Sequence, residues 1–230
     1  MVAARIYVVR HGETQANRDG VVQGQLDTEL NAAGLEQARR VARALRAVHF
    51  DAAYSSDLLR ALKTAQIILE HRPDIEICTD KALRERYMGE LQGKKLLLPP
   101  GTGVWAIATG EAPEALAARA AGWWTRAVLQ RTLALPPRDT AYNVLVTSHG
   151  GLIGGLVRTL IGSGRVRCAE GVVVRSCGNT GVTVVEVDAQ GVGTVVRYGD
   201  VTHLSDEEAE GMVETNVDEA VVGPAATRIP

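Results

Sequence analysis

The sequence has few aromatic residues and few cysteines, and both shortages narrow the class of protein. Aromatic residues make up 4% of the 230 residues, with a single Phe and three Trp. The core must therefore consist mainly of Ala, Val, Leu and Ile, which suits helices packed on a sheet. The three cysteines, Cys78, Cys168 and Cys177, form no Cys-x-x-Cys pair. We expect reduced thiols in a cytoplasmic protein.

Long apolar runs are also missing. No segment approaches the ~20 apolar residues that a membrane span needs, and the first residues lack the apolar stretch of a signal peptide. No Lys/Arg stripe interleaved with aromatic residues is present, which argues against a nucleic-acid partner. At 46% hydrophobic and 23% charged residues, the composition is that of a globular protein. The sequence does not indicate an oligomeric state.

The charge is distributed unevenly along the chain. Residues 205–222 contain seven acidic residues and no basic one, although the formal net charge of the whole chain is only −2. The preceding 204 residues hold 24 basic and 20 acidic residues. We therefore expect a flexible acidic tail over 205–230 and a slightly cationic body that is compatible with an anionic substrate.

Strand and helix patterns alternate along most of the chain. Strands are predicted at 6–9, 51–54, 75–79, 143–147, 171–175, 180–188 and 193–198, and helices at 31–48, 57–72, 111–131 and 152–161. This order predicts a three-layer α/β/α sandwich whose mainly parallel sheet carries an antiparallel edge strand. We expect a single domain over 1–204, in which 94–118 is a covering insertion, because its first part is rich in Gly and Pro and its apolar residues show no clear period.

Two predicted strands end in the same way. Arg10-His11-Gly12 follows the first strand, and Ser148-His149-Gly150 follows the strand at 143–147. If these strands are neighbours in a parallel sheet, the ~4.8 Å strand spacing places both imidazoles within reach of one small group. Arg60 follows a third strand and can reach the same crevice, so two guanidiniums and two imidazoles are expected together.

This set of side chains suits a phosphoryl group. Guanidiniums bind phosphate oxygens through forked hydrogen bonds, and a neutral imidazole can attack phosphorus and carry the phosphoryl group. Because the cations come from the protein, we expect no metal or cofactor. The leaving oxygen still needs a proton, for which Glu85 and Glu13 are the candidates. Glu13 could instead orient Arg10 or cap a helix.

The sequence resembles the histidine phosphatase superfamily, in its phosphoglycerate-mutase-like branch. The motifs that carry the resemblance follow the family's order over most of residues 4–155: Val8-Val9-Arg10-His11-Gly12-Glu13-Thr14 with Asn17, Leu30-Asn31 to Ala38, Tyr54-Ser55-Ser56-Asp57 to Ala65, Leu83-Arg84-Glu85-Arg86 to Gly93, and Val146-Thr147-Ser148-His149-Gly150-Gly151. Arg-His-Gly alone is a weak signal, whereas the five motifs together are strong.

The resemblance implies a role for each matching residue. His11 would be the nucleophile, Arg10, Arg60 and His149 would hold the phosphoryl group, and Glu85 would donate a proton and later activate water. The expected substrate contacts are Asn17, Gln23, Gly24 and the Gly150 amide. The implied activity is metal-independent hydrolysis of a small phosphorylated metabolite through a phosphohistidine.

Two alternatives stay open. A phosphoglycerate mutase shares the first half of the reaction, but the mutase pattern has a basic insertion, whereas residues 96–118 contain no Lys or Arg. Hydrolysis is therefore favoured, and a bisphosphatase acting on fructose 2,6-bisphosphate falls within that class. The second alternative is a non-catalytic module that binds a phosphorylated ligand. It leaves His11 unexplained, because pure binding needs no nucleophile.

Overall fold

The computed structural model describes residues 1–95 and 109–204. Most of the predicted covering insertion, residues 96–108, and the acidic tail, residues 205–230, lie outside the described residues. No helix in the described part of the chain is long and apolar enough to cross a membrane.

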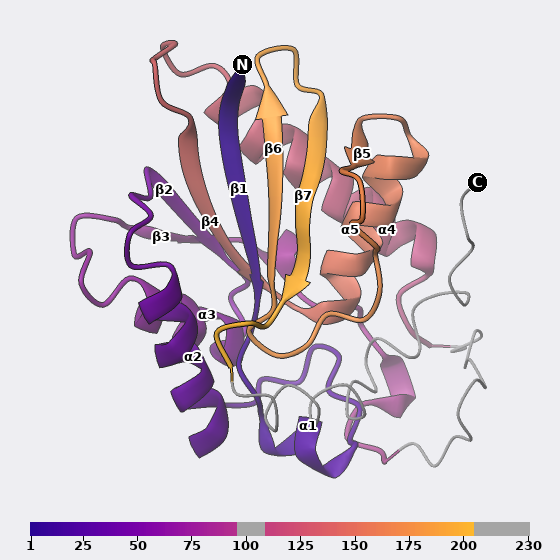
Figure 1. Ribbon diagram of the computed structural model, residues 1–230. Coiled ribbons are helices and arrows are strands. Elements are labelled where there is room, and N and C mark those ends of the chain that lie inside the picture. The colour runs from indigo at the N-terminus through magenta and orange to yellow at the C-terminus, as the bar shows by residue number, and fades with distance from the viewer. Residues whose placement is uncertain (96–108, 205–230) are drawn as a thin grey trace.

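One seven-stranded sheet forms the middle layer, in the order β3-β2-β4-β1-β6-β7-β5 (Figure 1). The strands are β1 (Val2–Arg10), β2 (Ala52–Ser55), β3 (Ile77–Thr79), β4 (Tyr142–Ser148), β5 (Val166–Cys168), β6 (Val182–Asp188) and β7 (Gly193–Asp200). The pairs β3-β2, β2-β4, β4-β1 and β7-β5 are parallel, and β6 is antiparallel to both β1 and β7. The mainly parallel sheet is confirmed, but its reversed strand lies inside the sheet rather than at the expected edge.

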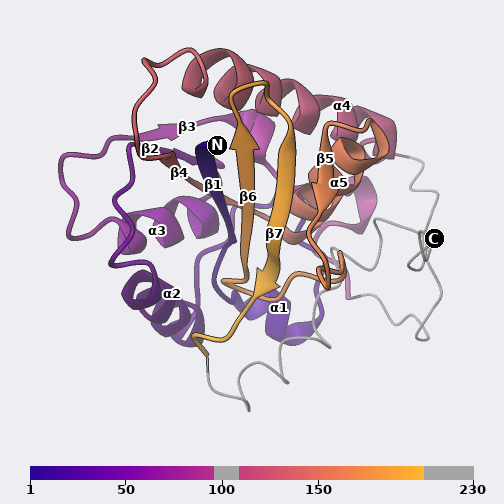
Figure 2. The same cartoon turned by 45° about the horizontal axis from the view of Figure 1, so that its top comes forward.

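Helices cover both faces of the sheet, as the alternating pattern predicts. The structure contains α1 (Gln15–Asp19), α2 (Ala32–Ala44), α3 (Leu59–Ile68), α4 (Pro113–Trp124), α5 (Gly150–Gly162), the π-helix η3 (Thr125–Thr132) and the 3₁₀ turns η1 (Lys81–Leu83) and η2 (Gly89–Leu91). Helices α2 and α3 lie on one face, and α4 and α5 lie on the other (Figures 1 and 2).

The side chains of β1 divide between two hydrophobic clusters, because successive residues of a strand point to opposite faces. Ile6 and Val8 belong to the cluster that includes Leu116 of α4 and Leu152 of α5. Val9 belongs to the cluster that includes Val41 of α2. Because apolar side chains pack on both of its faces, β1 lies in the middle of the sheet. His11, which follows β1, therefore lies at the middle of the sheet's carboxyl edge.

Two predicted elements differ from the structure. The helix expected over 111–131 is α-helical only to Trp124 and continues as a π-helix, in which the Leu133 amide donates to the carbonyl of Val128, five residues earlier. The strand expected at 171–175 is wrong. Val172 and Val174 are partly buried against the core, but the strand that pairs with β7 is β5.

Candidate active site

The two histidines meet at the carboxyl ends of neighbouring strands. Strands β1 and β4 are parallel, with Arg10 opposite Ser148, so the residues that follow leave the sheet side by side. The ring centroids of His11 and His149 are 5.1 Å apart. Both side chains are at least 98% buried. The structure therefore confirms the predicted juxtaposition of the two imidazoles.

The hydrogen bonds of His11 determine which ring nitrogen carries the proton. Its Nδ1 lies 2.7 Å from the Gly12 carbonyl, which can only accept, so Nδ1 donates. The Nε of Arg60 donates to His11 Nε2 over 3.3 Å. Burial, followed by the charges of Arg60 and Arg10, holds the pKa of His11 well below 6.5. At neutral pH the side chain is a neutral imidazole with its lone pair on Nε2.

Two polar atoms of this cluster are buried without a hydrogen-bond partner among the described residues. They are Nε of Arg10 and Nδ1 of His149. The rest of each side chain is anchored: Arg10 Nη1 donates to the Cys177 carbonyl at 2.7 Å, and His149 Nε2 lies 2.9 Å from Ser56 Oγ. Buried polar groups normally have partners, so such atoms among buried cationic side chains indicate a place for an external acceptor such as a phosphate oxygen.

Arg60 is fully buried and is held by the loop that follows α1. Its Nη2 donates to the Gly24 carbonyl and its Nη1 donates to the Leu26 carbonyl, both at 2.7 Å. Gln23, predicted as a substrate contact, is also fully buried, and its Oε1 accepts from the hydroxyls of Thr14 and Thr28. In the structure, the backbone carbonyl of Gly24 binds Arg60 directly. Gln23 binds Thr14 and Thr28 and so stabilises the loop that holds Arg60.

Asn17 supports the backbone of His11 through Asn179. The Nδ2 of Asn179 donates to the His11 carbonyl at 3.1 Å and is 3.3 Å from Oδ1 of Asn17. The same Oδ1 accepts from the amide of Thr14, whose side chain caps α1. These bonds place Asn17 close to the backbone of His11, as expected for a residue near the site.

Glu85 is the acidic side chain that the structure brings to the beginning of α5. It is 1% exposed, and its Oε2 accepts from the Gly151 amide at 2.9 Å, while Oε1 accepts from the Arg86 amide. His149 and Gly150 immediately precede that amide, and a helix N-terminus of this kind favours anions. The Glu85 carboxylate therefore lies at the start of the helix that His149 precedes.

Glu13, the other candidate acid, is directed elsewhere. Its Oε1 accepts from Nδ2 of Asn31 at 2.7 Å and pairs with Arg18 at 2.9 Å. Its contacts hold the loop before α2 rather than the histidine pair. The structure therefore favours Glu85 over Glu13 as the acid.

Sequence reasoning missed several residues that hold the site together. Ser56 contacts His149, Asn179 binds the His11 carbonyl, and Thr64 Oγ1 accepts from the Gly12 amide at 3.1 Å. A Cβ on Gly12 would collide with the Gly34 carbonyl, so Gly12 permits close packing of the loop on α2. The sequence shows the pair Ser55-Ser56 at the end of β2, but it does not show which of the two hydroxyls contacts a histidine.

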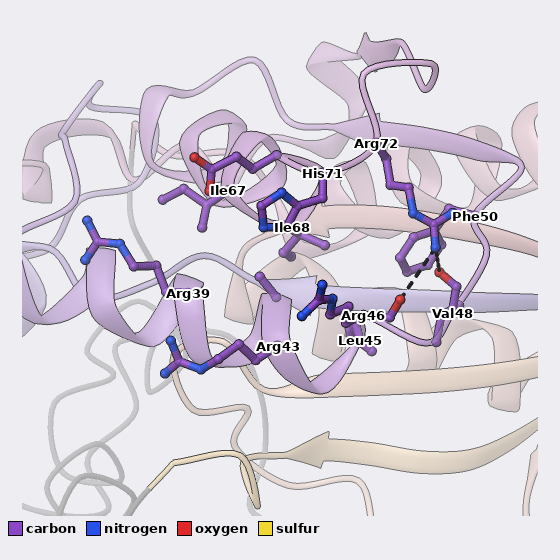
Figure 3. Close-up of a pocket in the computed structure, with 12 residues that line it drawn as sticks. Arg39, Arg43, Leu45, Arg46, Val48, Phe50, Ile67, Ile68, His71 and Arg72 are labelled. Atoms are coloured by element: carbon purple, nitrogen blue, oxygen red, sulfur yellow. Dashed lines mark hydrogen bonds between the residues drawn. The ribbon is translucent and has the colours of Figure 1, made fainter.

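A separate cavity of about 200 Å³ lies between the C-terminal parts of α2 and α3 (Figure 3). Arginines surround an apolar floor that includes Phe50, and Arg72 donates to the carbonyls of Arg46 and Val48. None of the predicted site residues lines this cavity. We therefore assign the chemistry to the histidine pair.

The fold and the site together define a phosphoryl-transfer enzyme of the α/β class. The family model described as "Histidine phosphatase superfamily (branch 1)" matches residues 6–201. The chain belongs to this superfamily, which confirms the family, and with it the class of phosphomonoester hydrolase, predicted from the sequence.

Relatives cover most of the chain. It is 35% identical to a phosphoglycerate mutase-like protein of Arabidopsis thaliana, over 88% of both chains. It is 31% identical to a broad-specificity phosphatase of Saccharomyces cerevisiae, over 89% of both. The structure of a mycobacterial glucosyl-3-phosphoglycerate phosphatase superposes with a TM-score of 0.70 at 27% identity, covering 85% of this chain and 98% of the other.

Proposed function

We propose that the protein hydrolyses phosphomonoesters of small metabolites through a phosphohistidine on His11, with no metal. The observation that carries the proposal is the state of His11: Nδ1 donates to the Gly12 carbonyl, so the lone pair is on Nε2, inside a buried cationic cluster. This lone pair accepts from Arg60 Nε in the ligand-free protein and becomes available when that N–H donates to a phosphoryl oxygen instead. A neutral imidazole in that state is a nucleophile, and guanidiniums beside it neutralise the dianion that it must attack.

In the first half-reaction, Arg10, Arg60 and His149 hold the phosphoryl oxygens. The Nε2 of His11 forms a bond to phosphorus as the bond from phosphorus to the ester oxygen breaks. The carboxyl of Glu85 gives its proton to that leaving oxygen. The unpartnered Nε of Arg10 and Nδ1 of His149 are the atoms that we assign to the phosphoryl oxygens.

In the second half-reaction, the Glu85 carboxylate accepts a proton from water. The water oxygen bonds to phosphorus, the bond to His11 breaks, and inorganic phosphate leaves. The nitrogen of His11 regains its lone pair, and Glu85 is protonated for the next cycle. The same carboxyl serves both halves because it stays bound to the Gly151 amide at the site.

The substrate class that we propose is a small sugar phosphate or carboxylated phosphate. The mycobacterial relative's name specifies an ester of this kind, and the yeast relative's name specifies broad specificity. Cytoplasmic location is part of the proposal: the three cysteines are unpaired, and Cys78 is an exposed thiol, which a reducing compartment preserves. Fractionation of cells expressing the tagged protein tests the location.

Hydrolysis of p-nitrophenyl phosphate by the pure protein in EDTA tests the activity. We expect turnover by the wild type, and a phosphorylated intermediate that is labile in acid and absent from His11→Ala. A binding module would show no turnover at any pH between about 5 and about 8. Assay of phosphoglycerate mutase activity in parallel separates the alternatives, because a mutase must exclude the water that a hydrolase uses.

A further inference from the structure

The backbone that carries Glu85 has little regular structure of its own. His11 follows a strand, Arg60 is on a helix, and His149 joins a strand to a helix, whereas Glu85 lies between the two short 3₁₀ turns η1 and η2. A proton donor must stay within hydrogen-bond distance of the leaving oxygen. Something outside this segment must therefore hold the loop of residues 82–87, which we call the acid loop.

Arg119 of α4 makes these contacts. Its Nη1 donates to the carbonyls of Ala82 and Arg84, at 2.9 and 2.8 Å. Its Nη2 donates to the carbonyl of Glu85 itself, at 3.3 Å. One guanidinium thus binds three carbonyls of the acid loop. A lysine, with a single nitrogen, has no comparable fork.

A carboxylate fixes the orientation of that guanidinium. Glu111 accepts from Arg119 through two bonds, Nε to Oε1 at 2.9 Å and Nη2 to Oε2 at 2.7 Å. Glu111 also binds the far end of the acid loop, because its carbonyl accepts from Nε of Arg86 and its amide donates to the Tyr87 carbonyl. The Arg119–Glu111 pair therefore binds the acid loop both before Glu85, at residues 82 and 84, and after it, at residues 86 and 87.

Helix α4 also packs against α5, the helix that holds the other end of Glu85. The Glu85 carboxylate is bound to the Gly151 amide at the start of α5. Its backbone is bound to Arg119 on α4. The two helices together determine where the carboxyl lies relative to His149. The charge of Arg119 also reaches this histidine, since it contributes to lowering the pKa of His149.

We propose that Arg119, oriented by Glu111, is a positioning residue that holds the Glu85 carboxyl where it can protonate the leaving oxygen. This inference rests on the proposed role of Glu85. A purely structural arginine would affect all substrates alike. A positioning residue for the acid affects esters in proportion to the basicity of their leaving group, because a stable leaving anion needs no proton.

The experiment compares p-nitrophenyl phosphate, a good leaving group, with phenyl phosphate, a poor one. The first-turnover release of each phenol is measured by quenched flow in wild type, Glu85→Gln, Arg119→Gln, Arg119→Lys and Glu111→Gln. General acid catalysis typically raises the rate of the chemical step about 10²–10⁴-fold. We therefore expect Arg119→Gln to lower the rate with phenyl phosphate at least ~10-fold and the rate with p-nitrophenyl phosphate less than ~3-fold. The Ki of inorganic phosphate for this variant should stay within ~2-fold of the wild-type value.

Arg126→Gln is the matched control, because it removes the same charge from the π-helix that continues α4. Its side chain is 59% exposed and is 3.7 Å from Asp80, so neither ester should slow. Equal losses for both esters in Arg119→Gln, or no loss, would overturn the inference. If that variant does not fold, the same pattern in Glu111→Gln and partial recovery in Arg119→Lys decide the question.

The comparison also separates this inference from the function on which it rests. If Glu85→Gln itself slows both esters equally, Glu85 is not the proton donor, and the proposed mechanism fails together with the role of Arg119. If Glu85→Gln discriminates between the esters and the Arg119 and Glu111 variants do not, only the positioning role fails.

Discussion

The ring of His149 lies 5.1 Å from the ring of His11, tilted by 60°, at the ends of adjacent parallel strands. Burial is the first cause that holds both pKa values well below 6.5, and the charge of Arg60 is the second. The two rings are therefore neutral in the ligand-free protein. We expect protonation of His149, which would aid phosphate binding, only when a dianion compensates for the nearby guanidiniums.

The lowered pKa values predict how stability depends on pH. An unfolded histidine takes up a proton near pH 6.5, whereas these two resist it, so the unfolded state binds more protons as the pH falls below about 6.5. The contribution of these two histidines to the free energy of unfolding should be fully present above that pH. Below it, the free energy of unfolding should decline by at most about 1.4 kcal/mol per pH unit for each group.

Urea unfolding between about pH 7.5 and about pH 5 measures this decline. His149→Gln should flatten it, because one of the two groups that resist protonation is gone. His71→Gln is the control, since His71 is exposed and outside the site. A slope in His149→Gln equal to that of the wild type would contradict the prediction.

Ser56→Ala should impair catalysis more than it impairs folding. The hydroxyl of Ser56 is the described partner of His149 Nε2, at 2.9 Å, and its loss frees the ring to rotate. We expect kcat to fall about 10-fold, less than the about 100-fold that a displaced catalytic group can cost. The loss of stability should be about 1 kcal/mol.

Ser55→Ala is matched to this change. Ser55 is also buried, but its hydroxyl binds the Ser56 carbonyl and Thr147 rather than a histidine. It should lose similar stability, about 1 kcal/mol, while kcat stays within about 3-fold of the wild type. Steady-state kinetics and urea unfolding of both variants give the comparison. An equal loss of kcat in both would rule out a specific effect on His149.

Gly151→Ala should displace Glu85. A Cβ at this position would lie 2.6 Å from Oε1 of the carboxylate, and the carboxylate would have to leave the Gly151 amide. We expect kcat to fall about 100-fold, within the range attributed to general acid–base catalysis. Steady-state rates with phenyl phosphate provide the measurement.

Gly155→Ala in the same helix is the control. Its Cβ would meet only Leu116, at an ordinary 3.7 Å, so the substitution should raise stability by about 0.5–1 kcal/mol through helix propensity and leave kcat unchanged. If Gly151→Ala retained wild-type activity, the contact between that amide and Glu85 would not matter for catalysis.

The sheet and most of its helices could be predicted because periodicity is a local property. The β-branched run that precedes Arg10 and the polar cap at Asn31 are both readable in sequence, and Asn31 does cap α2 through the Gly34 amide. The irregular segments could not be read in this way. Val172-Val173-Val174 is a β-branched run of the kind found in strands, but whether such a run joins a sheet depends on a neighbouring strand with an open edge.

The sequence alone determined the chemical groups of the site and the strand ends that carry them, because residue type and strand pattern are encoded locally. Only the tertiary structure decided how those groups are held. It directs Glu13 to Asn31 and Arg18, places Glu85 on the Gly151 amide, and brings Arg119 to the acid loop from 34 residues away in sequence. Such contacts depend on how α4 and α5 pack on the sheet, and no local pattern records that packing.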